Sequence, residues 1–355
     1  MFNPYPYYYR DSYESIPEGF RTTVLMASEK ELIERTARKF AARAKPDLRI
    51  GIGDDAAVIR PRKGYEMVVT TDAFLEGVHF SIGVHSPAEI GYKALARATS
   101  DVAAMGARPL YFFVNLALPD SRTGKWFDSF LAGMSRAAHR FELVLAGGDT
   151  TKRPQVAINI SVIGAVLPGR AILRSGARPG DLLCVSGRLG EADLGLRVIQ
   201  LGWDKRTKWK RLLRKQFYPE PRLELGQWLA EKKIASAMID TSDGLSTDLG
   251  HICEASGVGA RVWAAKIPKV KIPNQLGLDA LRLALDGGED YELLFTVPRR
   301  LAGRLPKTIS GVPITVIGEI TRERKILLVD EQGRTTQLRN QGWDPFRSRT
   351  TRKQG

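Results

Sequence analysis

The stretch "MIDTSDGLSTDLGHI", residues 238–252, places three aspartates within nine positions, at Asp240, Asp243 and Asp248. An apolar run precedes it, so we predict a strand that ends at a strongly acidic turn. Carboxylates this close repel one another unless a positive charge lies among them. A metal ion is one source of that charge. The other interpretation is an Asp-Gly turn in which Ser242 or Asp243 caps the following helix, and the stretch alone leaves both open.

Aspartates follow other predicted strands in the same way. The stretch "MVVTTD" leads to Asp72, "LVLAGGD" to Asp149, and "RIGIGDD" to Asp54 and Asp55, while Asp101 lies inside the apolar helix "LARATSDVAAMGA". Four apolar strands that end in aspartate predict a convergent acidic site. Oxygen ligands without His or Cys clusters favour Mg²⁺, whose shell substrate phosphates usually complete. The pattern therefore indicates nucleotide chemistry.

The familiar phosphate-binding loops do not explain this pattern. The sequence has no G-x-x-x-x-G-K-[ST] loop. "GIGDDA" satisfies the dinucleotide fingerprint, but Asp54 and Asp55 would then face a pyrophosphate that needs bare backbone N–H groups. Protein-kinase signatures are absent, and no Ser-His-Asp or Cys-His arrangement can be argued from the spacings.

Composition sets the broad class of the protein. With 43% hydrophobic and 26% charged residues among 355, it is typical of a globular protein with room for two domains. No apolar stretch approaches a membrane span, and the two cysteines, Cys184 and Cys253, are expected to be reduced core residues of a cytoplasmic protein.

The net charge of +15 raises the question of nucleic-acid binding. Seven of the twelve residues 205–216 are Lys or Arg. They suit either a charged helix face or, with Trp209, a polyanion site. No nucleic-acid module accompanies the charge, so nucleic acid is not the expected partner, and a basic surface also steers anionic small substrates.

Helical and strand patterns alternate along the whole chain. We predict helices at 28–44, 86–106, 124–141, 221–233, 245–256 and 277–285, and strands at 48–59, 65–74, 110–119, 142–149, 155–168, 235–240, 260–264, 290–297, 312–317 and 325–330. Turn chemistry near 165–170 marks a domain boundary. We therefore expect a disordered extension (1–27), two α/β or α+β domains (28–167 and 168–346) and a basic tail (347–355).

The motifs resemble, in order and spacing, those of the thiamine-monophosphate kinases. The resemblance covers roughly residues 28–346 and rests on "GIGDDAAVI", "VVTTDAFLEGVHF", "YKALARATSDVAAMGARP", "AGGDTT", "LRSGARPGD", "IDTSDGLSTDLGHI", "GGEDYELLF" and "GWDPF". It implies the two-domain fold of the aminoimidazole ribonucleotide synthetase-like superfamily, with an N-terminal α/β domain that binds ATP and Mg²⁺ and dimerises through its sheet, and a C-terminal α/β domain. The implied reaction is direct in-line transfer of the ATP γ-phosphoryl group to thiamine monophosphate, assisted by several Mg²⁺ ions and without a covalent intermediate.

The resemblance also implies roles for individual residues, which we list by ligand. The metal ligands would be Asp54, Thr70, Thr71, Asp72, Asp101, Asp149, Asp240 and Asp243. The ATP contacts would be Gly148, Asp149, Arg174 and Ser242. The thiamine-monophosphate contacts would be His79, Glu289 and Trp343. The implied partners are these two small substrates and a second copy of the chain.

Simpler interpretations remain open for several residues. His79 suits a polar loop, Trp343 a C-terminal anchor packed on the core, Arg174 a surface ion pair and Asp55 a turn cap, and Glu292 is expected to be a solvated strand residue. The whole chain could also be a non-catalytic nucleotide sensor or a polyanion-binding protein that kept the fold.

Two positions depart from the family pattern. Ala98 replaces the Asn that usually precedes "SD", and Pro345 stands where the terminal motif commonly has His. Other superfamily members are disfavoured, because the chain lacks the terminal or N-terminal cysteines on which two of them depend.

Overall fold

The computed structural model describes residues 27–41, 45–203 and 209–345. By their contacts the residues group into two compact units. Of the described residues, the first comprises 27–41, 45–102, 108–168 and 199–203, and the second comprises 103–107, 169–198 and 209–345. Apart from Ala27, the predicted extension and the basic tail lie outside the described residues.

The first unit contains helices α1 to α3 and strands β1 to β6. The helices are α1 (Glu29–Phe40), α2 (Pro87–Ala104) and α3 (Lys125–Arg140). The strands are β1 (Leu48–Ile50), β2 (Val58–Ile59), β3 (Glu66–Leu75), β4 (Arg108–Leu118), β5 (Val144–Lys152) and β6 (Ala157–Val166).

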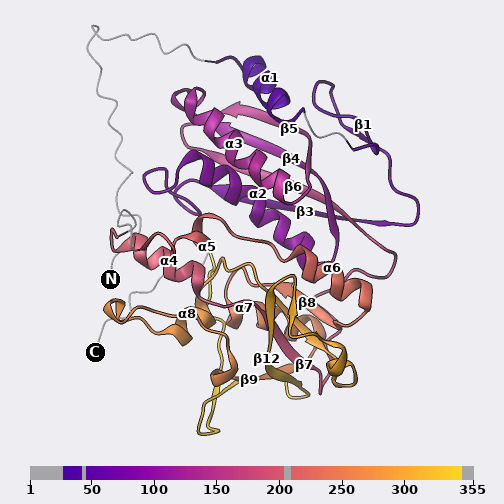
Figure 1. Ribbon diagram of the computed structural model, residues 1–355, viewed down its shortest axis with the longest axis vertical. Helices are drawn as coiled ribbons and strands as arrows, with labels where there is room; N and C mark the ends of the chain where they lie inside the picture. The colour runs from indigo at the N-terminus through magenta and orange to yellow at the C-terminus, as the bar shows by residue number, and fades with distance from the viewer. Residues whose placement is uncertain (1–26, 42–44, 204–208, 346–355) are drawn as a thin grey trace. The chain divides into compact units, whose positions relative to one another are not determined.

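In the described part of this unit, β3, β6, β4 and β5 form a sheet in that order. Strand β4 is parallel to β5, and the other neighbours are antiparallel. Helices α2 and α3 lie over one face of the sheet (Figure 1). They touch through their backbones, because a Cβ at Gly133 would stand 1.8 Å from the carbonyl oxygen of Ala88.

Helix α1 begins with the predicted capping box. The Glu31 N–H donates to Ser28 Oγ at 3.3 Å, and the Ser28 N–H donates to Glu31 Oε2 at 2.7 Å. Each contact satisfies a backbone donor that the first helical turn leaves without a partner. The predicted helix start is therefore confirmed.

Two aspartates do not end their strands as predicted. Strand β3 continues past Asp72 to Leu75, and β5 continues past Asp149 to Lys152, because their partners β6 and β4 keep pairing with them. Both strands are edges of the sheet, where a carboxylate within a strand can still reach solvent. Strand β8 does end at its aspartate, Asp240.

The second unit contains helices α4 to α8 and strands β7 to β14. The helices are α4 (Glu191–Gln200), α5 (Arg214–Phe217), α6 (Leu223–Lys232), α7 (Leu245–Ser256) and α8 (Ala280–Asp286). The strands are β7 (Leu182–Ser186), β8 (Ala237–Asp240), β9 (Gly259–Trp263), β10 (Leu293–Val297), β11 (Thr308–Ile309), β12 (Val312–Thr321), β13 (Ile326–Val329) and β14 (Thr335–Gln337).

The second sheet has hydrophobic clusters on both faces. Its described strands run in the order β14-β13-β9-β12-β7-β10-β8, with β11 attached to β12. Along β7 the side chains alternate: Leu183 and Val185 pack in the cluster that includes residues of α7, while Cys184 packs with residues of α6. Helices and strands are thus mixed in both units, which confirms the predicted fold class.

Both cysteines are buried and reduced, as predicted. Burial raises the pKa of Cys184 to about 12, and it does the same for Cys253. Neither thiol is ionised near neutral pH, so both act as small apolar core residues.

In its described part, residues 209–216, the basic run is not one continuous helix. Residues 204–208 lie outside the described residues, and residues 214–217 form the short helix α5. Trp209 is 4% exposed. Its ring therefore offers no surface on which a nucleic-acid base could stack. No helix in the described ranges is long and apolar enough to cross a membrane.

Candidate active site

In the first unit, β3 and α2 bring together three of the predicted metal-binding residues. Thr70 Oγ1 donates to Asp101 Oδ2 at 2.5 Å. Two positions along β3, Asp72 Oδ1 accepts from Arg97 Nη2 of α2 at 3.3 Å, and Arg97 Nε lies 3.2 Å from Asp72 Oδ2 in the same ion pair. The carboxylates of Asp72 and Asp101 thus lie on the α2 side of the sheet. Arg97 supplies a cation beside them.

Thr71 points to the other face of the sheet. Its Oγ1 accepts hydrogen bonds from Asn159 Nδ2 at 3.0 Å and Ser161 Oγ at 3.2 Å, both on β6. Side chains alternate along a strand, so consecutive residues of "TTD" cannot all face the same way. The hydroxyl of Thr71 therefore lies on the opposite face of the sheet from the Thr70 hydroxyl and the Asp72 carboxylate.

Gly148 and Asp149 lie on β5, at the opposite edge of the sheet from β3. The register aligns Asp72 with Ile160, Val114 and Gly148, so the two edge backbones are three strand spacings, about 14 Å, apart. A Cβ at Gly148 would stand 2.0 Å from the Val114 carbonyl oxygen. Strand packing alone therefore requires this glycine, whatever its role toward ATP.

Asp54 lies in the exposed turn between β1 and β2. Gly53 precedes it with a φ of 117°, a conformation that residues with a Cβ rarely adopt. Asp54 Oδ1 accepts from the Asp55 N–H at 2.9 Å. The turn thus holds Asp54 at the surface of the first unit.

His79 follows β3 and is half-buried. Its Nδ1 accepts from the Leu75 N–H at 3.0 Å, and its ring centroid lies 5.8 Å from that of Phe74. The accepting Nδ1 places the imidazole proton of the neutral ring on Nε2. The ring is fixed in place rather than solvated in a loop.

In the second unit, the helix that follows the acidic turn after β8 is not capped by Ser242 or Asp243. The N-cap of α7 is Gly244, with a φ of 111° and no side-chain cap bond of its own. Asp248 Oδ2 accepts the N–H groups of Asp243, at 3.2 Å, and Gly244, at 3.0 Å. Capping by Ser242 or Asp243 is therefore wrong, and Asp248 satisfies the helix start.

The three carboxylates of this turn lie close enough to influence one another. Burial raises the pKa of Asp248 well above its ordinary value, and the nearby charges of Asp240 and Asp243 raise it further. Such repulsion is what a cation bound at the turn would relieve.

The segment around Glu289 is bonded to the acidic turn. The Glu289 N–H donates to the Ser242 carbonyl oxygen at 2.8 Å, and the Tyr291 N–H donates to that of Thr241 at 2.9 Å. Glu289 and Tyr291 adopt φ values of 68° and 51°. Left-handed backbone is unfavourable for such residues and persists where the surroundings enforce it, often at functional sites.

Trp343 reaches the same turn from the C-terminal part of the chain. Its N–H donates to the Asp243 carbonyl oxygen at 2.9 Å, and a Cβ at Gly342 would stand 2.0 Å from that oxygen. The Trp343 residue is 43% exposed. Its backbone is anchored while its ring is not buried, so the interpretation as a core anchor is wrong.

Arg174 lies on the surface of the second unit. Its carbonyl oxygen accepts from Ser256 Oγ at 3.3 Å. Among the described residues its side chain makes none of the ion pairs that the simpler interpretation expected. The structure thus brings Ser242, Asp243, Glu289 and Trp343 together around one turn. Arg174 lies on a separate, exposed segment.

The expectation that Glu292 is solvated is wrong. Its carboxylate is fully buried and accepts from Lys215 Nζ at 2.8 Å, Arg222 Nε at 2.6 Å and Ser186 Oγ at 2.6 Å. Burial alone would raise its pKa, but Lys215 and Arg222 outweigh burial and hold the pKa at about 2. The sequence signal, a glutamate in an otherwise apolar strand, was present, but the partners are far away in the chain.

This depressed pKa predicts a specific acid sensitivity. The pKa of Glu292 is lower in the folded state than in the unfolded state. The ionised carboxylate, with Lys215 and Arg222, therefore stabilises the fold above about pH 4.5 and loses that contribution as the pH falls toward 2. We expect the free energy of unfolding, measured by urea titration, to fall over this range. The difference between the wild type and Glu292→Gln should shrink over the same range; a constant difference would contradict the assignment.

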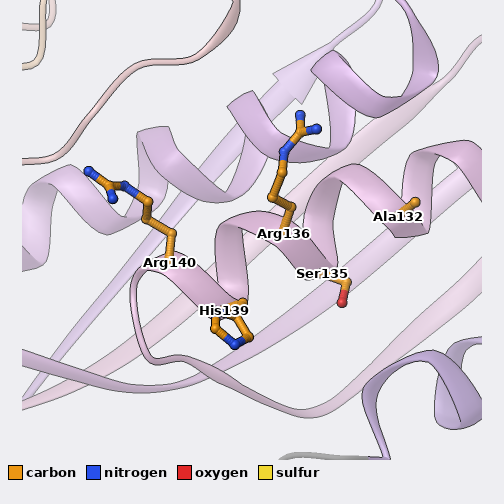
Figure 2. A pocket seen from close by; sticks show the side chains of 5 residues that line it. All are labelled: Ala132, Ser135, Arg136, His139 and Arg140. Atoms are coloured by element: carbon orange, nitrogen blue, oxygen red, sulfur yellow. The ribbon is translucent and has the colours of Figure 1, made fainter.

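No ready-made metal cage is seen within the described ranges, where no three His, Cys, Asp or Glu side chains are arranged to hold a metal ion. A depression on α3 with a volume of about 640 Å³ is lined by Ala132, Ser135, Arg136, His139 and Arg140. Arg136 and Arg140 point to one side of the helix and His139 to the other (Figure 2). These groups do not converge on a ligand, and none of them is a predicted site residue.

Comparison with known proteins shows the family to which the chain is related. The two domain models of the AIR synthase related proteins match residues 53–166 and 178–330. The thiamine-monophosphate kinase of Salmonella typhimurium is 40% identical over 84% of this chain and 93% of its own length. The crystal structure of the thiamine-monophosphate kinase from Stenotrophomonas maltophilia is 34% identical, with a TM-score of 0.74 over 86% of this chain and 96% of that one.

A further neighbour is a structure of AaThiL complexed with AMPPCP and TMP. It is 28% identical, with a TM-score of 0.71 over 90% of this chain and 97% of its own. Sequence and fold therefore agree over nearly the full length of these kinases. This chain belongs to the thiamine-monophosphate kinase family.

Proposed function

We propose that this protein phosphorylates thiamine monophosphate to thiamine diphosphate with ATP, by direct in-line transfer of the γ-phosphoryl group. Family membership supports the reaction, and a neighbour was solved with AMPPCP, an ATP analogue, and TMP. The observation that carries the proposal in this chain is the convergence of Ser242, Asp243, Glu289 and Trp343 on the turn after β8. No covalent intermediate on the protein is part of the proposal.

The proposal includes several Mg²⁺ ions. The ligands would be Asp54, Thr70, Thr71, Asp72, Asp101 and Asp149 in the first unit and Asp240 and Asp243 in the second. All offer oxygen atoms, which Mg²⁺ prefers. Since the described residues form no complete cage, each ion would take one or two carboxylates and fill its shell with phosphate oxygens and water, as is usual for Mg²⁺. Bound there, the ions would neutralise and align the two phosphates.

For ATP, the contacts would come from both an exposed cation and backbone groups. The exposed guanidinium of Arg174 suits phosphate oxygens, which it can bind in bidentate fashion. Gly148 and Asp149 on β5 and Ser242 after β8 would supply the other contacts.

For thiamine monophosphate, the contacts would be His79, Glu289 and Trp343. The thiazolium ring is cationic, so the Glu289 carboxylate can balance its charge. The half-exposed indole of Trp343 offers a face for stacking or cation–π contact.

The proposal also includes a homodimer formed through the first sheet, in the cytoplasm. On β3, Met67 and Val69 are 37% and 67% exposed, and Ile50 and Val58 on β1 and β2 are also exposed. Apolar side chains gathered on one unit support an interface with a second copy. The unpaired cysteines fit a reducing compartment. Light scattering in solution measures the oligomeric state.

The direct test is an assay with purified protein, ATP, Mg²⁺ and thiamine monophosphate, with thiamine diphosphate and ADP separated by chromatography. We expect equal amounts of the two products, and loss of turnover when EDTA removes the metal. Free thiamine serves as the acceptor control. ATP hydrolysis without formation of thiamine diphosphate would indicate that the enzyme acts on another substrate of the superfamily. Binding of ATP without any turnover would favour the nucleotide sensor.

A further inference from the structure

Gln216, the last residue of the basic run, lies against the carboxylate of Glu289. Its Nε2 donates to Glu289 Oε2 at 3.0 Å. Gln216 is 2% exposed, whereas Glu289 is half-buried. With the amide reversed, its oxygen would face the carboxylate and repel it, so the contact itself fixes which end of the amide donates.

The other end of the same amide is in an unfavourable position. Gln216 Oε1 is buried and has no hydrogen-bond partner among the described residues. A buried acceptor without a partner costs about 1–3 kcal/mol. Stability alone would therefore favour an apolar side chain of the same size here. What the amide contributes is the bond to Glu289.

The surroundings hold Gln216 in a fixed place. On one side, Lys215 binds the buried Glu292 at 2.8 Å. On the other, a Cβ added to Gly195 of α4 would stand 2.9 Å from Gln216 Cβ, so α4 and α5 meet there without space between them. The donor is thus placed before any substrate binds.

The Glu289 side chain needs such a donor. Its backbone is fixed by the bond to Ser242, but a glutamate side chain has three rotatable bonds. Burial raises the pKa of a second carboxylate, Asp193 of α4; its partner Arg197 opposes this, and the nearby charge of Glu289 adds to the rise. Repulsion between these two groups acts on Glu289, and a neutral donor that binds it opposes the displacement.

We propose that Gln216 is a positioning residue, which orients the Glu289 carboxylate for the cationic part of thiamine monophosphate without touching the substrate itself. This inference rests on the proposed function of the site. It gives the end of the basic run, which the family resemblance leaves without a role, a task in substrate recognition.

The test compares Gln216→Met, Glu289→Ala and the double variant in the kinase assay. Met keeps the volume and removes the donor. We expect Gln216→Met to raise the KM for thiamine monophosphate roughly fivefold to tenfold, since a hydrogen bond to a charged group is lost. The KM for ATP should stay unchanged, and the thermal midpoint should not fall, because the variant also removes the buried Oε1 that has no partner among the described residues. In the Glu289→Ala background no acceptor remains, so Gln216→Met should then add less than about twofold.

Gln227→Met is the matched control, because Gln227 is a half-buried glutamine on α6 in the same unit. It should leave both KM values unchanged. Equal increases in the two KM values for Gln216→Met, or its full effect in the Glu289→Ala background, would overturn the positioning role. An unchanged KM for thiamine monophosphate in an active enzyme would do the same. If the wild type makes no thiamine diphosphate, the proposed function fails, and this inference fails with it.

Discussion

We expect Asp72→Asn to lower kcat/KM for thiamine monophosphate by about a thousandfold, while the protein stays folded. Asn has the same shape but lacks the charge that a Mg²⁺ ligand needs. Asp72 lies on the same side of the sheet as Asp101 and Thr70, so its loss weakens a shared group of oxygen donors. The Arg97 side chain that pairs with Asp72 is only 13% exposed, so the loss of the charge should also lower the free energy of unfolding, and urea denaturation of the variant accompanies the kinetics.

Asp128→Asn provides the matched control. Asp128 also belongs to the first unit and also pairs with an arginine, Arg35, at 2.6 Å, but its side chain is 62% exposed on α3. We expect unchanged kinetics for this variant. The Mg²⁺ concentration needed for half-maximal rate should rise for Asp72→Asn alone. Retention of more than a tenth of kcat/KM by Asp72→Asn at saturating Mg²⁺ would remove Asp72 from the proposed ligands.

Local sequence was sufficient for most of the secondary structure. The helix predicted at 245–256 is α7, Leu245–Ser256, because apolar periodicity and the following glycine act within a few residues. Strand ends were less predictable. Strand β3 runs on beyond Asp72 because β6 continues to pair with it, and a partner strand distant in the chain is invisible to a local pattern.

The same limit explains what was missed at the site. The acidic turn was recognisable, but its cap is Asp248 rather than Ser242, since the choice among neighbouring acceptors depends on the turn geometry set by Gly244. Gln216 gave no local sign of importance, and Glu292, although it stands in an otherwise apolar strand, gave no local sign of its partners. Their partners lie 73, 77 and 70 residues away, so only the folded chain reveals the contacts.

We expect Glu292→Gln to lower the free energy of unfolding by about 3–5 kcal/mol. The carboxylate is fully buried between two cations whose side chains are only 18% and 12% exposed, those of Lys215 and Arg222. Removing the negative charge leaves both cations poorly solvated and close to each other. Urea denaturation near neutral pH measures the loss, and the kinase assay would show whether the Glu289 segment moves with it.

Glu319→Gln is the control that tests whether burial, rather than the number of cationic partners, sets the loss in the free energy of unfolding. Glu319 of β12 also lies between two arginines, Arg261 at 3.5 Å and Arg299 at 3.1 Å, but those side chains are 50% and 64% exposed. Water replaces the lost charge there, so this variant should lose less than about 1 kcal/mol. Equal losses for the two variants would show that burial does not set the strength of the Glu292 network. A large loss for Glu292→Gln alone would establish that the buried carboxylate holds α5 and β10 together, and with them the residues next to the proposed substrate site.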